Sequence, residues 1–395
     1  MRQPLTNRYP LSIYVHVPFC TTKCTYCAFN TYTNLDHLIP AYVDALCAEI
    51  AYVGERTPQP NAGTVFFGGG TPSLLTAAQY DRIFDTLHQM FRVDEEAEIT
   101  LEANPNDLTP AYASALRAVG FNRISIGMQS ANARELQLFR RRHGVDEVMQ
   151  AVSAAREGGF DNINLDLIYG IPDQTRDDWI ATLRQALALR PMHISLYALG
   201  IEEDTPMATW VDRGLVPMPD DDLAADMYAD ADALLEQDGF VQYEISNWAR
   251  DGQTSRHNLQ YWRSLPYLGL GPGGHGFVDG VRYATMLSPQ RYIAALTTRL
   301  DAPRPAFPLT PAVGEWSALT LDDEISEMLI MGLRLVQEGI AFDDFRARFG
   351  VDLMQRHGAV FTHYAQHGLI DLNETHVRLT KRGRLLSNMV FRELV

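Results

Sequence analysis

The chain has 395 residues, of which 46% are hydrophobic, and its 33 basic and 49 acidic residues give a formal charge of −16. This length and composition indicate a globular protein of about two or three domains with a large core. A strongly acidic chain is repelled by a phosphate backbone, so no nucleic acid partner is expected.

Localisation and redox chemistry follow from the apolar runs and the cysteines. No apolar run reaches the ~18 residues that cross a bilayer, and the start of the chain lacks the apolar core of a signal peptide. We therefore expect a cytoplasmic protein. Its four cysteines, three of them crowded, fit metal or redox chemistry better than a disulfide framework.

Short apolar, β-rich runs alternate with helix-compatible stretches up to about residue 220. Strands are predicted at 12–17, 64–67, 98–101, 123–126, 162–168 and 193–197. Helices are predicted between them at 36–54, 76–90, 110–119, 132–157 and 175–189. This alternation predicts an α/β fold in which right-handed crossovers curl a parallel sheet into a full or partial (β/α)6 barrel.

Glycine and polar residues cluster directly after these strands, at 68–71, 102–105, 127–130 and 169–172. The carboxyl ends of parallel strands share one rim, where barrel proteins build their sites. An open, doubly wound sheet would gather ligands at the same strand ends. We therefore expect a ligand site on this rim for either architecture.

The pattern changes beyond residue 220, where a predicted helix at 221–238 precedes a glycine-rich segment at 267–275. A linker is predicted from three prolines, Pro303, Pro305 and Pro308. Helices and two short strands in the tail predict a small α+β, winged-helix-like domain. Such a winged-helix domain often binds DNA. The acidic net charge of the chain supports a role in protein interaction or as a lid at least equally. The expected domains are 1–220, 221–305 and 306–395.

Cys20, Cys24 and Cys27 follow the first predicted strand. Helical spacing would place their sulfurs along a stripe, so the three thiolates can face one point only from a loop. Such a loop suits an iron–sulfur cluster or zinc. Zinc needs a fourth ligand, for which Cys47 and His16 are available, although Cys47 in a helix is more simply a buried small hydrophobe. A four-iron cluster on three thiolates leaves one iron open to a further ligand.

The order of the motifs resembles the radical S-adenosylmethionine (SAM) superfamily, and within it the coproporphyrinogen-oxidase-like branch. The matching segments are YVHVPFC, CTTKCTYC, FGGGTPS, EANP, SIGMQS and NLDLIYGIP. The resemblance covers nearly the whole chain. It implies a [4Fe–4S] cluster held by Cys20, Cys24 and Cys27, with the open iron chelated by the amino and carboxylate groups of SAM.

The resemblance also implies which residues bind SAM. They are Tyr14, Phe29, Gly69, Gly70, Thr71, Glu102, Gln129, Arg141 and Asp166. Carboxylates suit the ammonium and ribose hydroxyls of SAM, and a guanidinium suits its carboxylate. For Arg141, which lies between two other arginines, a solvated basic helix end is the alternative.

Two departures from the branch favour haem carriage over oxidation. The oxygen-independent coproporphyrinogen oxidases carry a further cysteine where this chain has Phe29, and a longer segment ahead of the motif than the 19 residues here. The segment HNLQYW resembles the HNxxYW signature of the HemW-type haem chaperones, which makes His257, Tyr261 and Trp262 the haem candidates. An imidazole can ligate haem iron, and aromatic rings can pack on the macrocycle. A packed, hydrogen-bonded histidine is the alternative for His257.

The resemblance therefore implies a haem chaperone that carries a SAM-coordinated [4Fe–4S] cluster and transfers haem to an unidentified acceptor protein. The alternatives are an oxygen-independent coproporphyrinogen III oxidase, which decarboxylates porphyrinogen propionates, and another radical SAM enzyme acting on a tetrapyrrole. No catalytic residue is assigned. Whether the protein is an enzyme, a monomer or a dimer, or peripherally attached to a membrane is left open.

Overall fold

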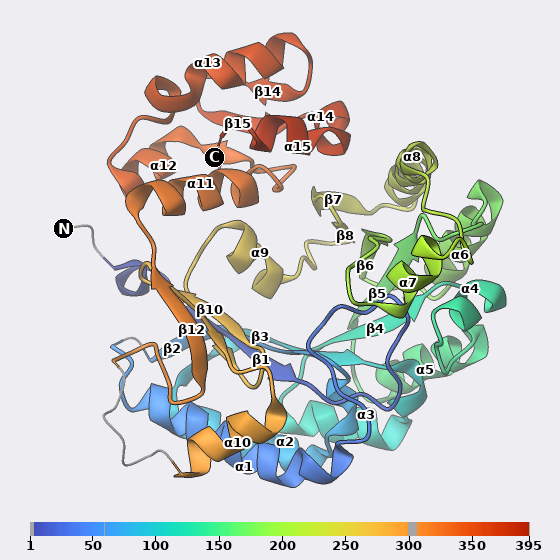
Figure 1. Ribbon diagram of the computed structural model, residues 1–395, viewed down its shortest axis with the longest axis vertical. Helices are drawn as coiled ribbons and strands as arrows, with labels where there is room; N and C mark the ends of the chain where they lie inside the picture. Colours follow the sequence, from blue (N-terminus) through green and yellow to red (C-terminus); the bar gives the residue numbers. More distant parts are fainter. Residues whose placement is uncertain (1–3, 59, 299–305, 395) are drawn as a thin grey trace.

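The computed structural model describes residues 4–58, 60–298 and 306–394. Its larger part is a 12-stranded sheet with the order β12-β11-β10-β9-β1-β2-β3-β4-β5-β6-β8-β7. The sheet curves into an incomplete barrel with helices on its convex side (Figure 1). This architecture confirms the predicted α/β fold with a partial parallel barrel.

The six predicted strands are parallel neighbours at the centre of the sheet. They are β1 (Leu11–Val17), β2 (Asn61–Gly69), β3 (Arg92–Ala103), β4 (Arg123–Gln129), β5 (Asn162–Tyr169) and β6 (His193–Ala198). The helices are α1 (Ile39–Gly54), α2 (Ala77–Met90), α3 (Pro110–Val119), α4 (Ala133–Leu138), α5 (Val145–Glu157), α6 (Arg176–Ala188), α7 (Pro206–Asp212) and α8 (Asp221–Gln237). Short 3₁₀ turns lie at η1 (Leu5–Asn7), η2 (Asp36–Leu38), η3 (Pro72–Leu74) and η4 (Pro105–Asp107). Thr76 and Thr175 form capping boxes that begin α2 and α6.

Strand alternation divides the side chains between the two faces of the sheet. Ile13, Val15 and Val17 of β1 are fully buried in the core that the helices cover. The intervening Tyr14 and His16 therefore point to the concave face, because successive side chains of a strand alternate. The same period places polar side chains of β3 to β6 inside the barrel.

The predicted helix 132–157 is two helices, α4 and α5, and this part of the prediction was wrong. Arg140 has φ 56°, a left-handed conformation that ends the first helix. Glu147 then accepts the backbone N–H of Gly144 at 2.7 Å, where α5 begins. The break turns Arg141 toward the rim of the barrel.

Residues beyond 220 extend the large sheet at both edges. β8 (Asn247–Ala249) pairs antiparallel with β6, and β7 (Val241–Glu244) follows it. β9 (Tyr267–Leu270) pairs parallel with β1 and leads to β10 (His275–Val278), β11 (Val281–Thr285) and β12 (Val313–Ala318). Of the predicted linker, Pro303 and Pro305 lie outside the described residues, whereas Pro308 precedes β12. The three-domain division stays a prediction, because the middle segment shares the large sheet.

The C-terminal part has its own hydrophobic core, between Ile325 and Leu394. Its elements are α11 (Leu321–Gly332), β13 (Ile340–Ala341), α12 (Phe342–Phe349), α13 (Leu353–Gln366), β14 (Ile370–Leu372), β15 (His376–Leu379), α14 (Lys381–Leu385) and α15 (Ser387–Phe391). A small sheet, β13-β15-β14, completes the predicted α+β arrangement. This part lies on the concave side of the large sheet, with α9 (Arg256–Trp262) between them (Figure 1).

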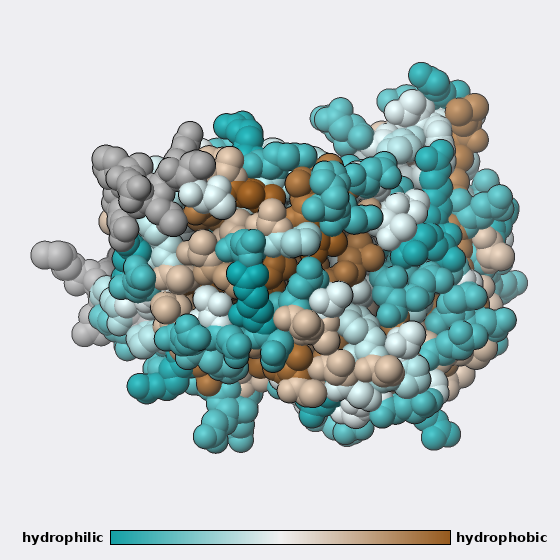
Figure 2. Space-filling view, turned by 90° about the horizontal axis from the view of Figure 1, so that it is seen from below, coloured by the Kyte–Doolittle hydropathy of each residue, from teal (hydrophilic) through white to brown (hydrophobic). Residues whose placement is uncertain are grey.

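The opposite face of the molecule is formed by the helical layer, to which α10 (Pro289–Thr298) contributes. Figure 2 shows this face from below, with hydrophobic residues gathered toward its middle and hydrophilic ones around them. None of the helices in the described ranges has the length and apolarity needed to cross a membrane.

Candidate functional site

The three crowded cysteines lie on the loop that follows β1. Cys20 is buried, and its backbone N–H donates to Tyr32 O at 2.9 Å, which closes the loop on itself. Cys27 N donates to Cys24 O at 3.3 Å. All three are free thiols on the carboxyl-end rim of the barrel, where the sequence predicted a site.

The middle of this loop is fixed to the neighbouring helices. Thr25 donates its hydroxyl to Leu138 O at 2.8 Å and its N–H to Phe139 O at 3.3 Å. The ring of Tyr26 packs edge-on against Phe139, with centroids 4.6 Å apart. Met207 N at the start of α7 donates to Thr25 O at 2.9 Å. The loop is therefore held by protein contacts between Cys24 and Cys27.

The surroundings of the thiols suit a polynuclear cluster. Burial raises the pKa of Cys20 and Cys27, and the neighbouring cysteines raise it further. Three adjacent thiolates are stable only beside compensating positive charge, which iron supplies. Thr71 donates to Cys20 Sγ at 3.4 Å and Arg141 Nη1 to Cys24 Sγ at 3.5 Å, so two of the sulfurs already have donors.

The same geometry does not suit a single zinc ion. Cys47 lies in the core under the helices, with its sulfur 4.0 Å from Arg82 O. His16 is engaged at both ring nitrogens, by Tyr14 and by Asn30 O, each at 3.0 Å. Neither residue supplies a fourth ligand in this conformation.

The glycine-rich segment after β2 packs directly against the cysteine loop. Gly69 has φ 107°, and a Cβ there would lie 2.4 Å from the His16 ring. A Cβ on Gly70 would lie 2.6 Å from Phe19 O. Gly70 N donates to Val17 O at 2.8 Å. The glycines are therefore required for the close approach of the two loops, besides any contact they make with a ligand.

Two carboxylates face each other across β4 inside the rim. Glu102 accepts the N–H of Gly69 at 3.1 Å, and Asp166 accepts from Ser125 Oγ at 2.7 Å and Asn164 Nδ2 at 2.8 Å. Burial, together with the charge of Asp166, raises the pKa of Glu102 to about 7. Such a pair favours a ligand that brings positive charge and hydrogen-bond donors, as SAM does with its sulfonium, amine and hydroxyls.

This pKa predicts a pH dependence for SAM binding. Below pH 7 Glu102 is protonated in the free protein, and SAM must displace that proton to meet a carboxylate. Affinity is therefore expected to rise with pH, by up to about tenfold per unit below 7, and to level off above it. Calorimetric titration of the cluster-loaded protein between pH 5.5 and 8.5 measures this, and Glu102→Gln should flatten the profile. An equal slope in the variant would contradict the assignment.

Arg141 lies within the rim and is not a solvated helix end. Its Nη2 donates to Gly127 O at 2.8 Å, and its Nε is buried without a partner among the described residues. A Cβ at Gly127 would lie 2.8 Å from Gln129 Nε2 and 3.0 Å from Arg141 Nη2, so both side chains gather at this glycine. An unpartnered guanidinium nitrogen beside the cysteine loop fits the carboxylate of SAM.

Two members of the predicted SAM set lie differently. Tyr14 lies deeper, with its ring 6.1 Å from Phe66 and 6.4 Å from His257, on the concave face. Phe29 is 68% exposed on the cysteine loop, although it adjoins Asn30, which donates to Pro272 O at 2.9 Å. The structure brings the other rim candidates together, but it leaves Phe29 on the surface.

The haem candidates lie on α9, inside the concave face. His257 is fully buried, with Nδ1 2.7 Å from Thr64 Oγ1 and Nε2 2.8 Å from the Tyr261 hydroxyl. Its ring stacks on Phe66 at 5.1 Å. Trp262 lies under the guanidinium of Arg334, 5.4 Å from its ring centroid. In this conformation His257 is a packed, hydrogen-bonded histidine, and no nitrogen of it is free for iron.

A set of buried polar side chains inside the barrel escaped the sequence analysis. Its members include Glu98, Arg123, Asn164, His193 and Glu244, all at most 5% exposed. The available signal was the alternation of polar residues in β5 and β6, where Asn162, Asn164 and Asp166 share a face. That signal does not identify cross-strand partners, which depend on register and on β8.

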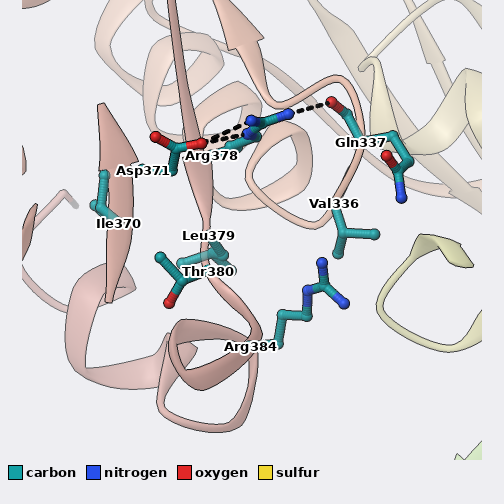
Figure 3. Close-up of a pocket in the computed structure, with 8 residues that line it drawn as sticks. All are labelled: Val336, Gln337, Ile370, Asp371, Arg378, Leu379, Thr380 and Arg384. Carbon is teal, nitrogen blue, oxygen red and sulfur yellow. Dashed lines mark hydrogen bonds and ion pairs between the residues drawn. The ribbon is translucent and has the colours of Figure 1, made fainter. Parts of the chain in front are cut away.

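A pocket of about 480 Å³ lies in the C-terminal part (Figure 3). Its lining residues are Val336, Gln337, Ile370, Asp371, Arg378, Leu379, Thr380 and Arg384. Arg378 pairs with Asp371 at 2.7 Å, whereas Arg384 projects toward Val336. Its lining contains no residue of the cluster, SAM or haem sets.

Comparison with known proteins agrees with this geometry. The model of the radical SAM superfamily matches residues 14–186, and that of the HemN C-terminal domain matches residues 319–386. The heme chaperone HemW of Mycobacterium tuberculosis is 37% identical over 389 residues, covering 98% of this chain and 95% of its own length. The chain belongs to the HemW family of the radical SAM superfamily. The heme chaperone HemW of Bacillus subtilis is 34% identical, with 96% and 98% coverage.

The chain also shares its fold with coproporphyrinogen III oxidase (HemN) from Escherichia coli. The two superpose with a TM-score of 0.82 at 25% identity, over 99% of this chain and 92% of the oxidase. Membership in the radical SAM superfamily implies a [4Fe–4S] cluster and SAM, and the donor set at the rim fits both. The resemblance found in the sequence is thereby confirmed at the level of the family.

Proposed function

We propose that this protein is a haem chaperone, which binds haem and transfers it to an acceptor protein. The observation that carries the proposal is the full-length similarity to curated heme chaperones HemW, at 31–37% identity in the bacterial relatives. Phe29, at the position of the oxidases' further cysteine, supports it. The Phe29 side chain is 68% exposed and carries no thiol, so this position would supply no ligand to the cluster.

Cys20, Cys24 and Cys27 would hold the [4Fe–4S] cluster, and the rim would hold SAM. When bound, the two together supply one-electron chemistry. Glu102 and Asp166 would accept hydrogen bonds from the amine and hydroxyls of SAM, and Arg141 would donate to its carboxylate. The remaining contacts with SAM would come from Gly69, Gly70, Thr71 and Gln129 on the rim, from Tyr14 deeper in the barrel and from Phe29 on the cysteine loop.

Haem binding at His257 would require α9 to leave its present position. The helix lies between the sheet and the C-terminal part (Figure 1), and both imidazole nitrogens of His257 are hydrogen-bonded. Release of α9 would free His257 and the rings of Tyr261 and Trp262 together. We therefore propose that the described conformation is closed to haem at His257. Haem would be covered afterwards by the C-terminal part or by the acceptor.

The oxidase is the second candidate, because its fold superposes over nearly the whole chain. Another radical SAM enzyme acting on a tetrapyrrole shares the same rim. Both alternatives require turnover, whereas a chaperone requires only stoichiometric binding and release.

Two assays on one anaerobically reconstituted preparation test the function. Haem titration is expected to give a Soret band that saturates at a fixed stoichiometry. Coproporphyrinogen III, SAM and reductant are expected to give no protoporphyrinogen, with a known oxidase as the positive control. Multiple turnovers would overturn the chaperone proposal, as would a Soret signal that never saturates.

A further inference from the structure

A chain of buried hydrogen bonds crosses the barrel interior from the rim to the beginning of α9. Asn164 Nδ2 donates to Asp166 Oδ1 at 2.8 Å, and His193 Nδ1 lies 2.6 Å from Asn164 Oδ1. His193 Nε2 lies 2.8 Å from the Tyr243 hydroxyl, which accepts the N–H of Ser255 at 3.1 Å. Ser255 is the N-cap of α9. The chain therefore joins a proposed SAM contact to the helix of the HNxxYW segment.

The direction of each bond in this chain is fixed by its chemistry. Asp166 only accepts, so Asn164 must turn its amide nitrogen to it and its carbonyl oxygen to His193. His193 Nδ1 then has to donate. Burial lowers the pKa of His193 well below its usual value, so the ring is neutral and Nε2 accepts from Tyr243. No member can turn without breaking the bond of its neighbour.

The far end of the hydrogen-bond chain is one of several anchors that hold α9, besides the bond between His257 and Thr64. Glu98 accepts the N–H groups of Arg256 and His257, each at 2.9 Å. Arg348 of the C-terminal part donates to Arg263 O at 3.0 Å, just past the helix. A helix of seven residues has little stability of its own, so these contacts determine whether α9 remains docked against the sheet. Loss of one anchor shifts the balance between a docked and a released α9.

We infer that SAM binding at Asp166 promotes the release of α9 and so controls haem access to His257. The inference rests on the proposed haem function. A ligand hydroxyl that donates to Asp166 competes for its oxygens with both of its present donors, Asn164 Nδ2 and Ser125 Oγ. Ser125 Oγ in turn accepts from Asn164 Nδ2 at 2.7 Å, so the ligand would disturb both contacts that orient the Asn164 amide toward His193.

Tyr243→Phe tests this coupling because it removes the hydroxyl that links His193 to Ser255 in the series of hydrogen bonds. In the cluster-loaded wild-type protein, SAM is expected to tighten haem binding at least about fivefold in a Soret titration, the lower end of ordinary coupling. In the variant the ratio of affinities with and without SAM should fall to about one. The matched control is Tyr228→Phe, because Tyr228 is equally buried and donates to Ile245 O at 3.0 Å, outside the chain.

Hydrogen exchange of the wild-type protein supplies a readout that needs neither the variant nor haem. The peptide covering 255–262 should exchange faster with SAM than without it, whereas the core strands should not change. Equal exchange overturns the coupling, and so does an unchanged affinity ratio in Tyr243→Phe. Absence of any saturable Soret band, with SAM or without, would instead refute the haem function. The two failures are therefore distinguishable.

Discussion

Replacing any one of Cys20, Cys24 and Cys27 by alanine is expected to abolish the iron–sulfur absorbance of the reconstituted protein. Each thiolate would bind a different iron, and the loop offers no substitute, because Phe29 has no donor and Cys47 lies in the core. SAM binding should fall with the cluster, since its chelating iron is lost. Visible absorbance and iron content after anaerobic reconstitution measure the effect.

Cys47→Ala is the matched control for these variants. It removes a thiol of α1 that lies in the hydrophobic core, with its sulfur 4.0 Å from Arg82 O, so it should retain the full absorbance. Its cost is a small core cavity, about 1 kcal/mol of folding stability. If Cys47→Ala lost the cluster, or if two of the three loop variants retained it, the three-thiolate assignment would be wrong.

The central fold was predictable from sequence because the two-residue period of its strands and the 3.6-residue period of its helices are both clear in the pattern of apolar residues. The six parallel strands are apolar runs whose alternate residues enter the helical core, as Ile13 and Val15 do. The edges were not predictable in this way. β7, β8 and β9 have three or four residues each, and β8 joins β6 only because the chain returns from α8. The break between α4 and α5 depends on the left-handed backbone conformation of Arg140, which an arginine in the sequence does not predict.

The proposed SAM residues on the rim were more predictable from sequence than the surroundings of Phe29 and of the haem candidate His257. Glu102, Asp166 and Arg141 follow predicted strands or lie near them, so the shared rim brings them together. Position alone could not place Phe29 on the surface. It also could not distinguish a ligand histidine from a packed one at His257, because the deciding contacts come from Thr64 and the sheet interior. Assignment of these residues to SAM and haem stays a prediction.

His257→Ala is expected to have two separable effects. The folding free energy should fall by about 2–4 kcal/mol, because the variant removes a buried ring with two hydrogen bonds. Below pH 6.5 this penalty should shrink. Burial lowers the pKa of His257 to about 3, so the wild-type protein itself loses stability as the unfolded chain gains a proton. Urea unfolding at pH 7.5 and pH 5 measures both values.

The second effect is on haem, and imidazole separates it from the first. If His257 is the axial ligand once α9 is released, the variant should lose the Soret band of a histidine-ligated haem. Added imidazole should restore that band, because it can enter the cavity left by the side chain and bind the iron. His363→Ala, at an exposed position on α13, controls for adventitious surface ligation. An unchanged band in His257→Ala without imidazole would remove His257 from the haem site, leaving it as a structural histidine that holds α9 closed.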